Sequence, residues 1–257
     1  MGNKKVRRKL NKKALLVILL TLYLIIMAFY YVFTLPIRNI NIVGNNLVTD
    51  AMIIEAAGIK DYPDIFRTSS KKIVNSVEAL DFIENAKVNK SINGTITIIV
   101  TESKPLFYNV LNKSVALSNG EEVEKNVADI IGIPTLVNYV PSDIYKELIS
   151  KMSATETDII SLISEIEYSP DVKDDITIND SRFILRMSDG NHVYIDLVNF
   201  ENLNRYKVIY SNLDEKGVLH LDGVYSGSDS DTIIFTSFAA LEAQNSSEEG
   251  GSNELSE

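Results

Sequence analysis

The sequence predicts an α+β protein with four parts: a single transmembrane helix, a domain of βααββ order, a mixed β-rich domain with helices, and a disordered tail. Three observations lead to this fold class. First, one segment near the N-terminus has no charged residue. Second, stretches with helical and with alternating apolar periodicity follow it. Third, the last residues are polar and acidic. The 257 residues are 45% apolar and 23% charged, which is ordinary globular composition.

The uncharged segment from Ala14 to Leu35 is long enough to cross a bilayer. Its 22 residues correspond to about 33 Å of helix, against about 30 Å of hydrocarbon. A cleavable signal peptide has a shorter apolar region followed by an Ala-x-Ala-like site, which is missing here. Seven Lys or Arg residues lie within residues 1–13, and the positive-inside rule therefore predicts a cytoplasmic N-terminus. We expect a basic cytoplasmic segment at 1–13 and a transmembrane helix at 14–35, in a single-pass type II protein of a bacterial plasma membrane.

The composition beyond the apolar segment excludes several classes of function. From Arg38 onward the chain holds 18 basic and 35 acidic residues, whereas a nucleic-acid-binding protein needs a basic surface. The chain has no cysteine, which excludes disulfides, cysteine-ligated zinc and a thiol nucleophile.

Residues 36–106 have the pattern of a βααββ domain. Ile37–Val43 reads as a strand, Thr49 can cap a first helix, and Ser69 or Ser70 a second helix. Two alternating segments then flank Asn93-Gly94, a pair suited to the positive φ angles of a type I′ turn. We expect the helices to cover one face of the sheet.

Residues 107–238 are predicted to form the β-rich domain. Two helices, Asp143–Met152 and Glu156–Ile163, precede short strands, and an amphipathic helix runs from Phe200 to Leu213. Val218–Asp222 and Thr232–Phe238 close the domain as strands. Residues 239–257 contain five acids and no base, and cannot bury enough apolar surface to order, so we expect a disordered acidic tail.

No pattern of catalytic or metal-binding residues is present. The only histidines are His192 and His220, without an HExxH, GxSxG, SxxK, P-loop or dinucleotide motif. Two carboxylates among Glu55, Glu78, Glu102 and Glu165 could converge as a glycosidase pair does, but the sequence favours no pair. We therefore expect no catalytic, cofactor-binding or metal-binding residues and no small-molecule substrate.

Several segments resemble the FtsQ/DivIB family of bacterial division proteins. These are the basic tail with its single span, Ile40–Asn45, the hairpin with Glu102 and Pro105 at its exit, and, in the β-rich domain, Ile133–Leu136, Ile163–Tyr168 and Gly217–Tyr225. The sequence departs from the family at two points. It has Ser91-Ile92-Asn93-Gly94 where the hairpin turn often contains proline, and His220 where an acid is common.

The resemblance implies a POTRA-like first domain and a non-enzymatic scaffold of the divisome, at the division septum. Its implied partners are the ectodomains of DivIC (FtsB) and FtsL, together with a septal penicillin-binding protein. An edge strand can accept a partner strand through its unpaired N–H and C=O groups, which makes the last strand the candidate site. Tyr225, Ile233, Phe235 and Phe238 are the candidate partner-binding residues, of which Tyr225 comes from the matching closing motif. Ile233 and Phe235 could equally face the core.

Two other functions remain open at this point. A membrane-anchored extracytoplasmic cell-wall enzyme would share the anchor and the lack of cysteine, but would need paired carboxylates or an activated serine. A secretion component would be expected to contain repeated modules or a barrel.

Overall fold

The computed structural model describes residues 11–125, 132–223 and 234–251, with side chains of the last stretch as far as Gln244. Within this part the chain divides into two compact units at Glu102/Ser103, and each unit is described by itself. The candidate residues Tyr225 and Ile233 lie outside the described residues.

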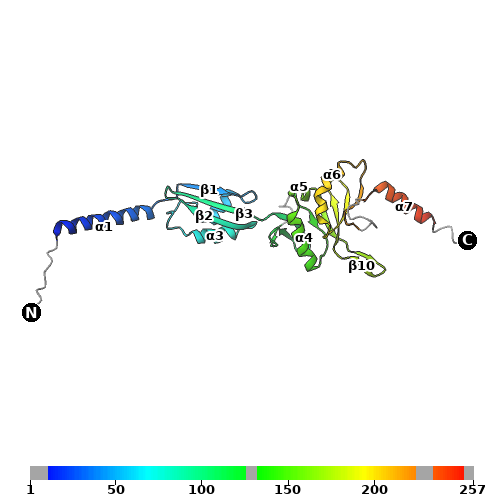
Figure 1. Cartoon of the computed structure of the whole chain (residues 1–257), viewed down its shortest axis with the longest axis horizontal. Coiled ribbons are helices and arrows are strands. Elements are labelled where there is room, and N and C mark those ends of the chain that lie inside the picture. Colours follow the sequence, from blue (N-terminus) through cyan, green and yellow to red (C-terminus); the bar gives the residue numbers. More distant parts are fainter. Residues whose placement is uncertain (1–10, 126–131, 224–233, 252–257) are drawn as a thin grey trace, which may run out of the picture. The chain divides into compact units, whose positions relative to one another are not determined.

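The first unit begins with helix α1, Lys12–Phe33 (Figure 1). This helix has the length and apolar composition of a membrane span. The Asn11 side chain accepts hydrogen bonds from the backbone N–H groups of Lys13 and Ala14 and caps the helix. The helix ends two residues before the predicted end of the transmembrane segment. Leu35 is not part of the span but is buried, 7% exposed, in the core of the domain that follows.

The rest of the first unit is a three-stranded sheet covered by two helices. Its elements are β1 (Asn39–Val43), α2 (Asp50–Ala56), α3 (Ser70–Glu78), β2 (Ile83–Lys90) and β3 (Thr95–Glu102). The strand order is β1-β3-β2, with β1 parallel and β2 antiparallel to the central β3. Ile53 of α2 and Ile73 of α3 pack with Ile96 and Ile98 of β3 in one core. The predicted βααββ order is confirmed, and Thr49 and Ser69 cap the two helices as expected.

The hairpin between β2 and β3 does not contain the predicted type I′ turn. That turn needs positive φ at both central residues, but here only Gly94 has it, at +89°, and Asn93 does not. The N–H of Gly94 donates to the carbonyl of Ser91 (3.1 Å), and the N–H of Ser91 donates to that of Thr95 (2.9 Å). The loop therefore has three residues, a type I turn followed by a glycine in the left-handed region, because the strands pair one residue further out than the dipeptide suggests.

The second unit contains a nine-stranded mixed sheet in the order β14-β13-β12-β11-β8-β7-β4-β5-β6. Its strands are β4 (Pro105–Asn109), β5 (Ser114–Leu117), β6 (Glu122–Glu124), β7 (Thr135–Leu136), β8 (Ile163–Tyr168), β11 (Arg182–Met187), β12 (His192–Asp196), β13 (Gly217–His220) and β14 (Ile234–Ser237). A separate two-stranded ribbon is formed by β9 (Asp171–Lys173) and β10 (Ile176–Asn179).

Helices pack on one face of this sheet and bury the core of the second unit. They are α4 (Ser142–Ala154), α5 (Thr157–Ile160), the 3₁₀ helix η2 (Phe200–Arg205) and α6 (Tyr206–Tyr210). Leu148 of α4 and Phe200 of η2 share this core with Val193 and Leu219 of the sheet. The helix predicted at Glu156–Ile163 is shorter than expected, since β8 already begins at Ile163.

The backbone after β14 is helical where a disordered tail is expected. Helix α7 covers Phe238–Gly251 and follows β14 directly. The Ser237 side chain accepts a hydrogen bond from the N–H of Ala240 (3.2 Å), which is the geometry of a helix N-cap. Alanine, leucine, glutamate and glutamine at the start of this segment have high helix propensity, and that local preference outweighs the low apolar content. Residues 252–257 lie outside the described part.

Candidate partner-binding site

Strand β14 lies at one end of the nine-stranded sheet. Among the described residues it is paired with β13 alone, in antiparallel register from Gly217 opposite Ser237 to His220 opposite Ile234. An edge strand turns the backbone groups of every second residue away from its neighbour, where another chain can pair with them. The predicted last strand is thus placed at the margin of the sheet.

The first residue of β13 must be glycine for β14 to approach this closely. A Cβ on Gly217 would lie 2.2 Å from the carbonyl oxygen of Thr236 and 2.7 Å from the Cα of Ser237. Both distances are shorter than real Cβ atoms show, so any side chain here would push the last strand away.

A buried polar network fixes the position of Gly217. Its N–H donates to the side-chain carbonyl of Asn191 (2.9 Å), and the Asn191 amide donates to the hydroxyl of Tyr206 (3.2 Å). That hydroxyl donates in turn to Asp189 (2.7 Å). Tyr206 is fully buried, and burial together with this hydrogen bond raises its pKa, which keeps the hydroxyl a donor. The network ties the start of β13 to the turn between β11 and β12.

A groove of about 400 Å³ lies between the outer face of the sheet and α7. The sheet contributes side chains from three neighbouring strands on the face away from the core, and α7 contributes two. These residues are Tyr194, Val218, His220, Ile234, Thr236, Leu241 and Gln244. The rings of Tyr194 and His220 are stacked with centroids 4.9 Å apart, and the Arg182 guanidinium lies 5.2 Å from the Tyr194 ring centroid. The groove thus combines aromatic, apolar and polar groups beside the edge strand.

The two described candidate residues lie on opposite faces of the sheet end. Phe235 pairs with Leu219, and its half-buried side chain packs against the core of the second unit. This is the core-facing orientation that the sequence left open as an alternative. Phe238 is the first residue of α7, and its ring contacts His192 edge-on at 5.2 Å.

None of the groove residues is among the four partner-binding candidates that the sequence predicts. Tyr194, His220 and Ile234 share one face because Tyr194 pairs with His220 and His220 with Ile234. Strand alternation could have shown which residues share a face within each strand. It could not have shown that α7 returns Leu241 to that face.

The two histidines do not form a metal site. His192 and His220 lie on neighbouring strands two residues out of register. His220 Nδ1 lies 3.7 Å from the buried carboxylate of Asp222. Within 11–125, 132–223 and 234–244, no group of three or more His, Asp or Glu side chains could hold a metal ion.

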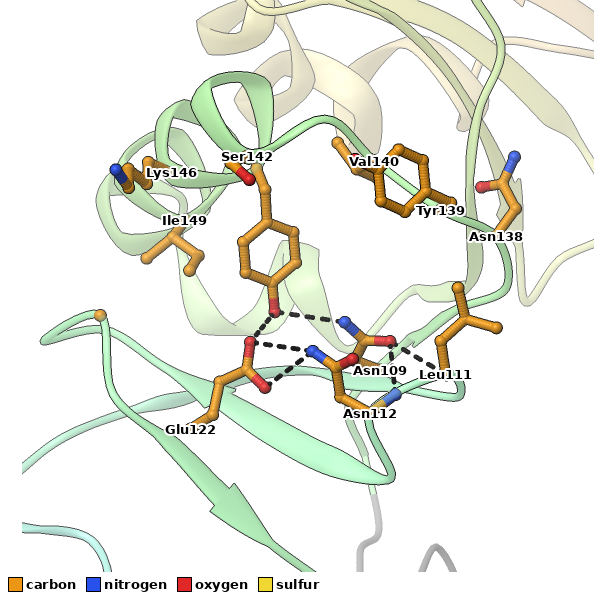
Figure 2. Close-up of a pocket in the computed structure, with 12 residues that line it drawn as sticks. Asn109, Leu111, Asn112, Glu122, Asn138, Tyr139, Val140, Ser142, Lys146 and Ile149 are labelled. Carbon is orange, nitrogen blue, oxygen red and sulfur yellow. Dashed lines mark hydrogen bonds between the residues drawn. The ribbon is translucent and has the colours of Figure 1, made fainter.

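A second cavity, of about 380 Å³, lies near the other end of the sheet (Figure 2). Glu122 on β6 faces Asn109 and Asn112 there, and accepts hydrogen bonds from the Tyr145 hydroxyl (2.6 Å) and the Asn112 amide (3.1 Å). Burial acts to raise the pKa of Glu122, but hydrogen bonds from Ser114, Tyr145 and Asn112 outweigh it and hold this pKa below its usual value. A general acid or base needs a pKa near the working pH, and the lowered pKa of Glu122 lies further from it. The Glu122 carboxylate is therefore suited to accept hydrogen bonds rather than to transfer protons.

The four glutamates considered for a carboxylate pair are spread over both units. Glu102 accepts hydrogen bonds from the backbone N–H groups of residues 46–48, and Glu78 accepts one from Ala86 (3.0 Å). Glu165 forms an ion pair with Arg186 (2.8 Å), and Glu55 is exposed on α2. Three of the four therefore have structural partners, and the first unit holds all but Glu165.

The fold defines the class of this protein. The described part of the chain has one helix long enough to cross a membrane, a βααββ unit directly after it, and a larger unit whose sheet ends in an edge strand. The family described as "POTRA domain, FtsQ-type" matches residues 35–103. The match begins at Leu35 and ends at the boundary between the units, in agreement with the burial of Leu35 in the first core.

The chain is also similar over most of its length to cell division proteins DivIB. It is 26% identical over 224 residues to DivIB of Brevibacillus brevis, which covers 84% of this chain and 83% of the relative. It is 24% identical over 232 residues to DivIB of Listeria monocytogenes, with 84% and 83% covered. The solved major extracytoplasmic domain of DivIB from Geobacillus stearothermophilus matches with 24% identity and a TM-score of 0.33, covering 44% of this chain and 96% of that one. The predicted resemblance to the FtsQ/DivIB family is confirmed, and α1 fits a membrane anchor.

Proposed function

We propose that the chain is a non-enzymatic, bitopic scaffold of the bacterial divisome, which helps to assemble and regulate septal peptidoglycan synthesis. Its outer units bind the ectodomains of a DivIC (FtsB)-like and an FtsL-like division protein. The similarity to DivIB proteins over most of the chain supports the role in division. One structural observation carries the mechanism of binding: β14 is the last strand of the sheet and lies beside a groove.

In this proposal a segment of the partner adds to β14 as a further strand. Backbone hydrogen bonds supply affinity, and alternate side chains of the added strand enter the groove beside Tyr194 and His220. Phe238 borders the site as a contact residue. Tyr225 and Ile233, which lie outside the described residues, stay proposed partner-binding residues. Phe235 contributes from the core side, because it holds β14 in place.

The mode of binding can be tested by disulfide scanning, because the chain has no cysteine of its own. Thr236→Cys places one thiol on the groove face of β14, and single cysteines are then moved along the partner segment. Strand addition predicts cross-links at every second partner position. Val208→Cys, which is 69% exposed on α6, is the matched control and should give none.

The proposal fails in part or as a whole under distinct outcomes. Cross-links without a period of two, or equal at both thiols, would refute strand addition. Release of soluble fragments from purified cell wall by the full chain would refute the scaffold role in favour of a wall enzyme. A uniform membrane signal of the tagged chain in normally dividing cells would refute the role in division.

A further inference from the structure

The link between α1 and the first core is very short. The uncharged part of α1, Ala14–Phe33, has the length of the hydrocarbon core of a bilayer, about 30 Å at about 1.5 Å per residue. Thr34 is the one residue between the end of the helix and the buried Leu35. Two residues reach at most about 7 Å, and a headgroup layer is roughly 5–8 Å thick. Leu35 must therefore lie within the headgroup layer on the outer side.

Two loops of the first unit are hydrogen-bonded directly to Leu35 and to the residues that follow it. The N–H of Ile65 donates to the carbonyl of Leu35 (2.9 Å), and the N–H of Ile37 donates to that of Pro63 (3.0 Å). The N–H of Arg38 donates to the carbonyl of Gly94 in the β2–β3 turn (2.8 Å). Both loops are thus held at the same end of the domain as the exit of the chain from α1.

The surface of this end suits a lipid interface. Ile92, at the tip of the β2–β3 turn, is 80% exposed, more than any other large apolar side chain of the described residues. Tyr62, beside Pro63, is 52% exposed with φ at +52°. Tyrosine is enriched where a membrane meets water, and an apolar side chain gains free energy by entering the acyl boundary.

The charges at this end differ from those of the remaining exterior. Residues 35–38, 60–68 and 90–94 carry four basic and two acidic side chains, whereas the rest of the chain from Arg38 onward has 14 basic and 33 acidic ones. The four basic residues are Arg38, Lys60, Arg67 and Lys90. Arg67 forms an ion pair with Asp64 (3.4 Å), and the Lys90 ammonium donates to the carbonyl of Thr68. The acidic exterior would be repelled by anionic lipid, but this end would not.

We infer that the end of the first unit formed by residues 35–38, 60–68 and 90–94 lies in the lipid headgroup layer, with Ile92 at the acyl boundary and Tyr62 among the headgroups. The inference rests on the membrane anchoring in the proposed function. Its consequence is a second attachment of the first unit to the bilayer, beyond the covalent one through α1.

The test places one fluorescent probe at a time on the full chain, which contains no cysteine. Ile92→Cys is labelled with an environment-sensitive dye, and the protein is reconstituted in vesicles of phosphatidylglycerol and phosphatidylethanolamine. Lipids with a quencher near the headgroup report the depth of the probe. We expect several-fold stronger quenching than in lipid-free detergent controls, together with a blue shift of the emission.

Three matched positions make the result decisive. Leu47→Cys carries an exposed apolar side chain beyond the other end of β1, and Ser188→Cys occupies the same turn position in the second unit, before Gly190. The Leu47 probe should not be quenched, and the Ser188 probe gives the signal of the same turn geometry outside the first unit. Ile25→Cys, in the middle of α1, reports insertion of the helix. If Ile25 is shielded in the bilayer and Ile92 behaves like Leu47, the inference is overturned and the anchor stands. If the Ile25 probe remains in water, the anchoring and the inference are both overturned.

Discussion

The Glu102 carboxylate organises the loop that follows β1, and its removal gives a measurable prediction. One carboxylate oxygen accepts hydrogen bonds from the N–H groups of Asn46 (2.9 Å) and Leu47 (2.8 Å), and the other accepts one from Val48 (2.8 Å). The loop lies directly before Thr49, which caps α2. Loss of this acceptor should therefore loosen both the loop and the start of the helix.

The size of the effect can be worked out from these three contacts. A hydrogen bond to a charged group contributes about 1.5–3 kcal/mol, but these N–H groups are partly exposed and water can replace the carboxylate. We expect Glu102→Ala to lower the free energy of unfolding of the first unit by about 2 kcal/mol, or roughly 8–16 °C in Tm for a domain of this size. Glu102→Gln keeps one acceptor oxygen and should cost about half as much.

Hydrogen exchange with mass spectrometry on the full chain checks this directly. Peptides that contain residues 46–48 should exchange faster in Glu102→Ala, while peptides of the second unit should not change. Glu84→Gln, a change at an exposed glutamate on β2, is the matched control. Unchanged exchange at residues 46–48 in Glu102→Ala would show that the carboxylate does not hold the loop.

Three further predictions concern the second unit. Gly217→Ala should push β14 away, because its Cβ would lie 2.2 Å from the Thr236 carbonyl oxygen. Hydrogen exchange at residues 234–237 should become faster, and less partner should co-purify with the chain. Wild-type behaviour in both assays would contradict the close packing. Hydrogen bonds lower the pKa of Glu122 in the folded chain. The stabilisation by Glu122 is therefore complete when the pH is above the usual pKa of a glutamate, and it is lost as the pH falls through the lowered pKa. Acid denaturation curves of Glu122→Gln should accordingly be shallower than wild type, and parallel curves would contradict this. Burial, with a smaller effect of neighbouring charge, lowers the pKa of His192. Phe238→Ala should expose the imidazole ring of His192 and raise the midpoint of its titration measured by NMR. An unchanged midpoint would show that Phe238 does not cover His192.

Local patterns were sufficient to predict the order of elements in the first unit. The caps at Thr49 and Ser69 and the alternation along β3 depend on residues close in sequence, and the structure confirms them. The turn at Asn93-Gly94 was predicted with the wrong type, because strand register decides how many residues a loop contains.

The sequence by itself determined the apolar span, the basic segment before it, the βααββ order and the resemblance to FtsQ/DivIB, because each depends on composition, short-range periodicity or motifs in a fixed order. Tertiary structure alone decided that Leu35 belongs to the first core rather than the span, that Phe235 faces inward, and that β14 lies at the margin of the sheet beside a groove covered by α7. These features depend on pairing between residues distant in the chain. A strand pattern shows which residues share a face, but only the assembled sheet shows which face is covered and which strand has a free edge.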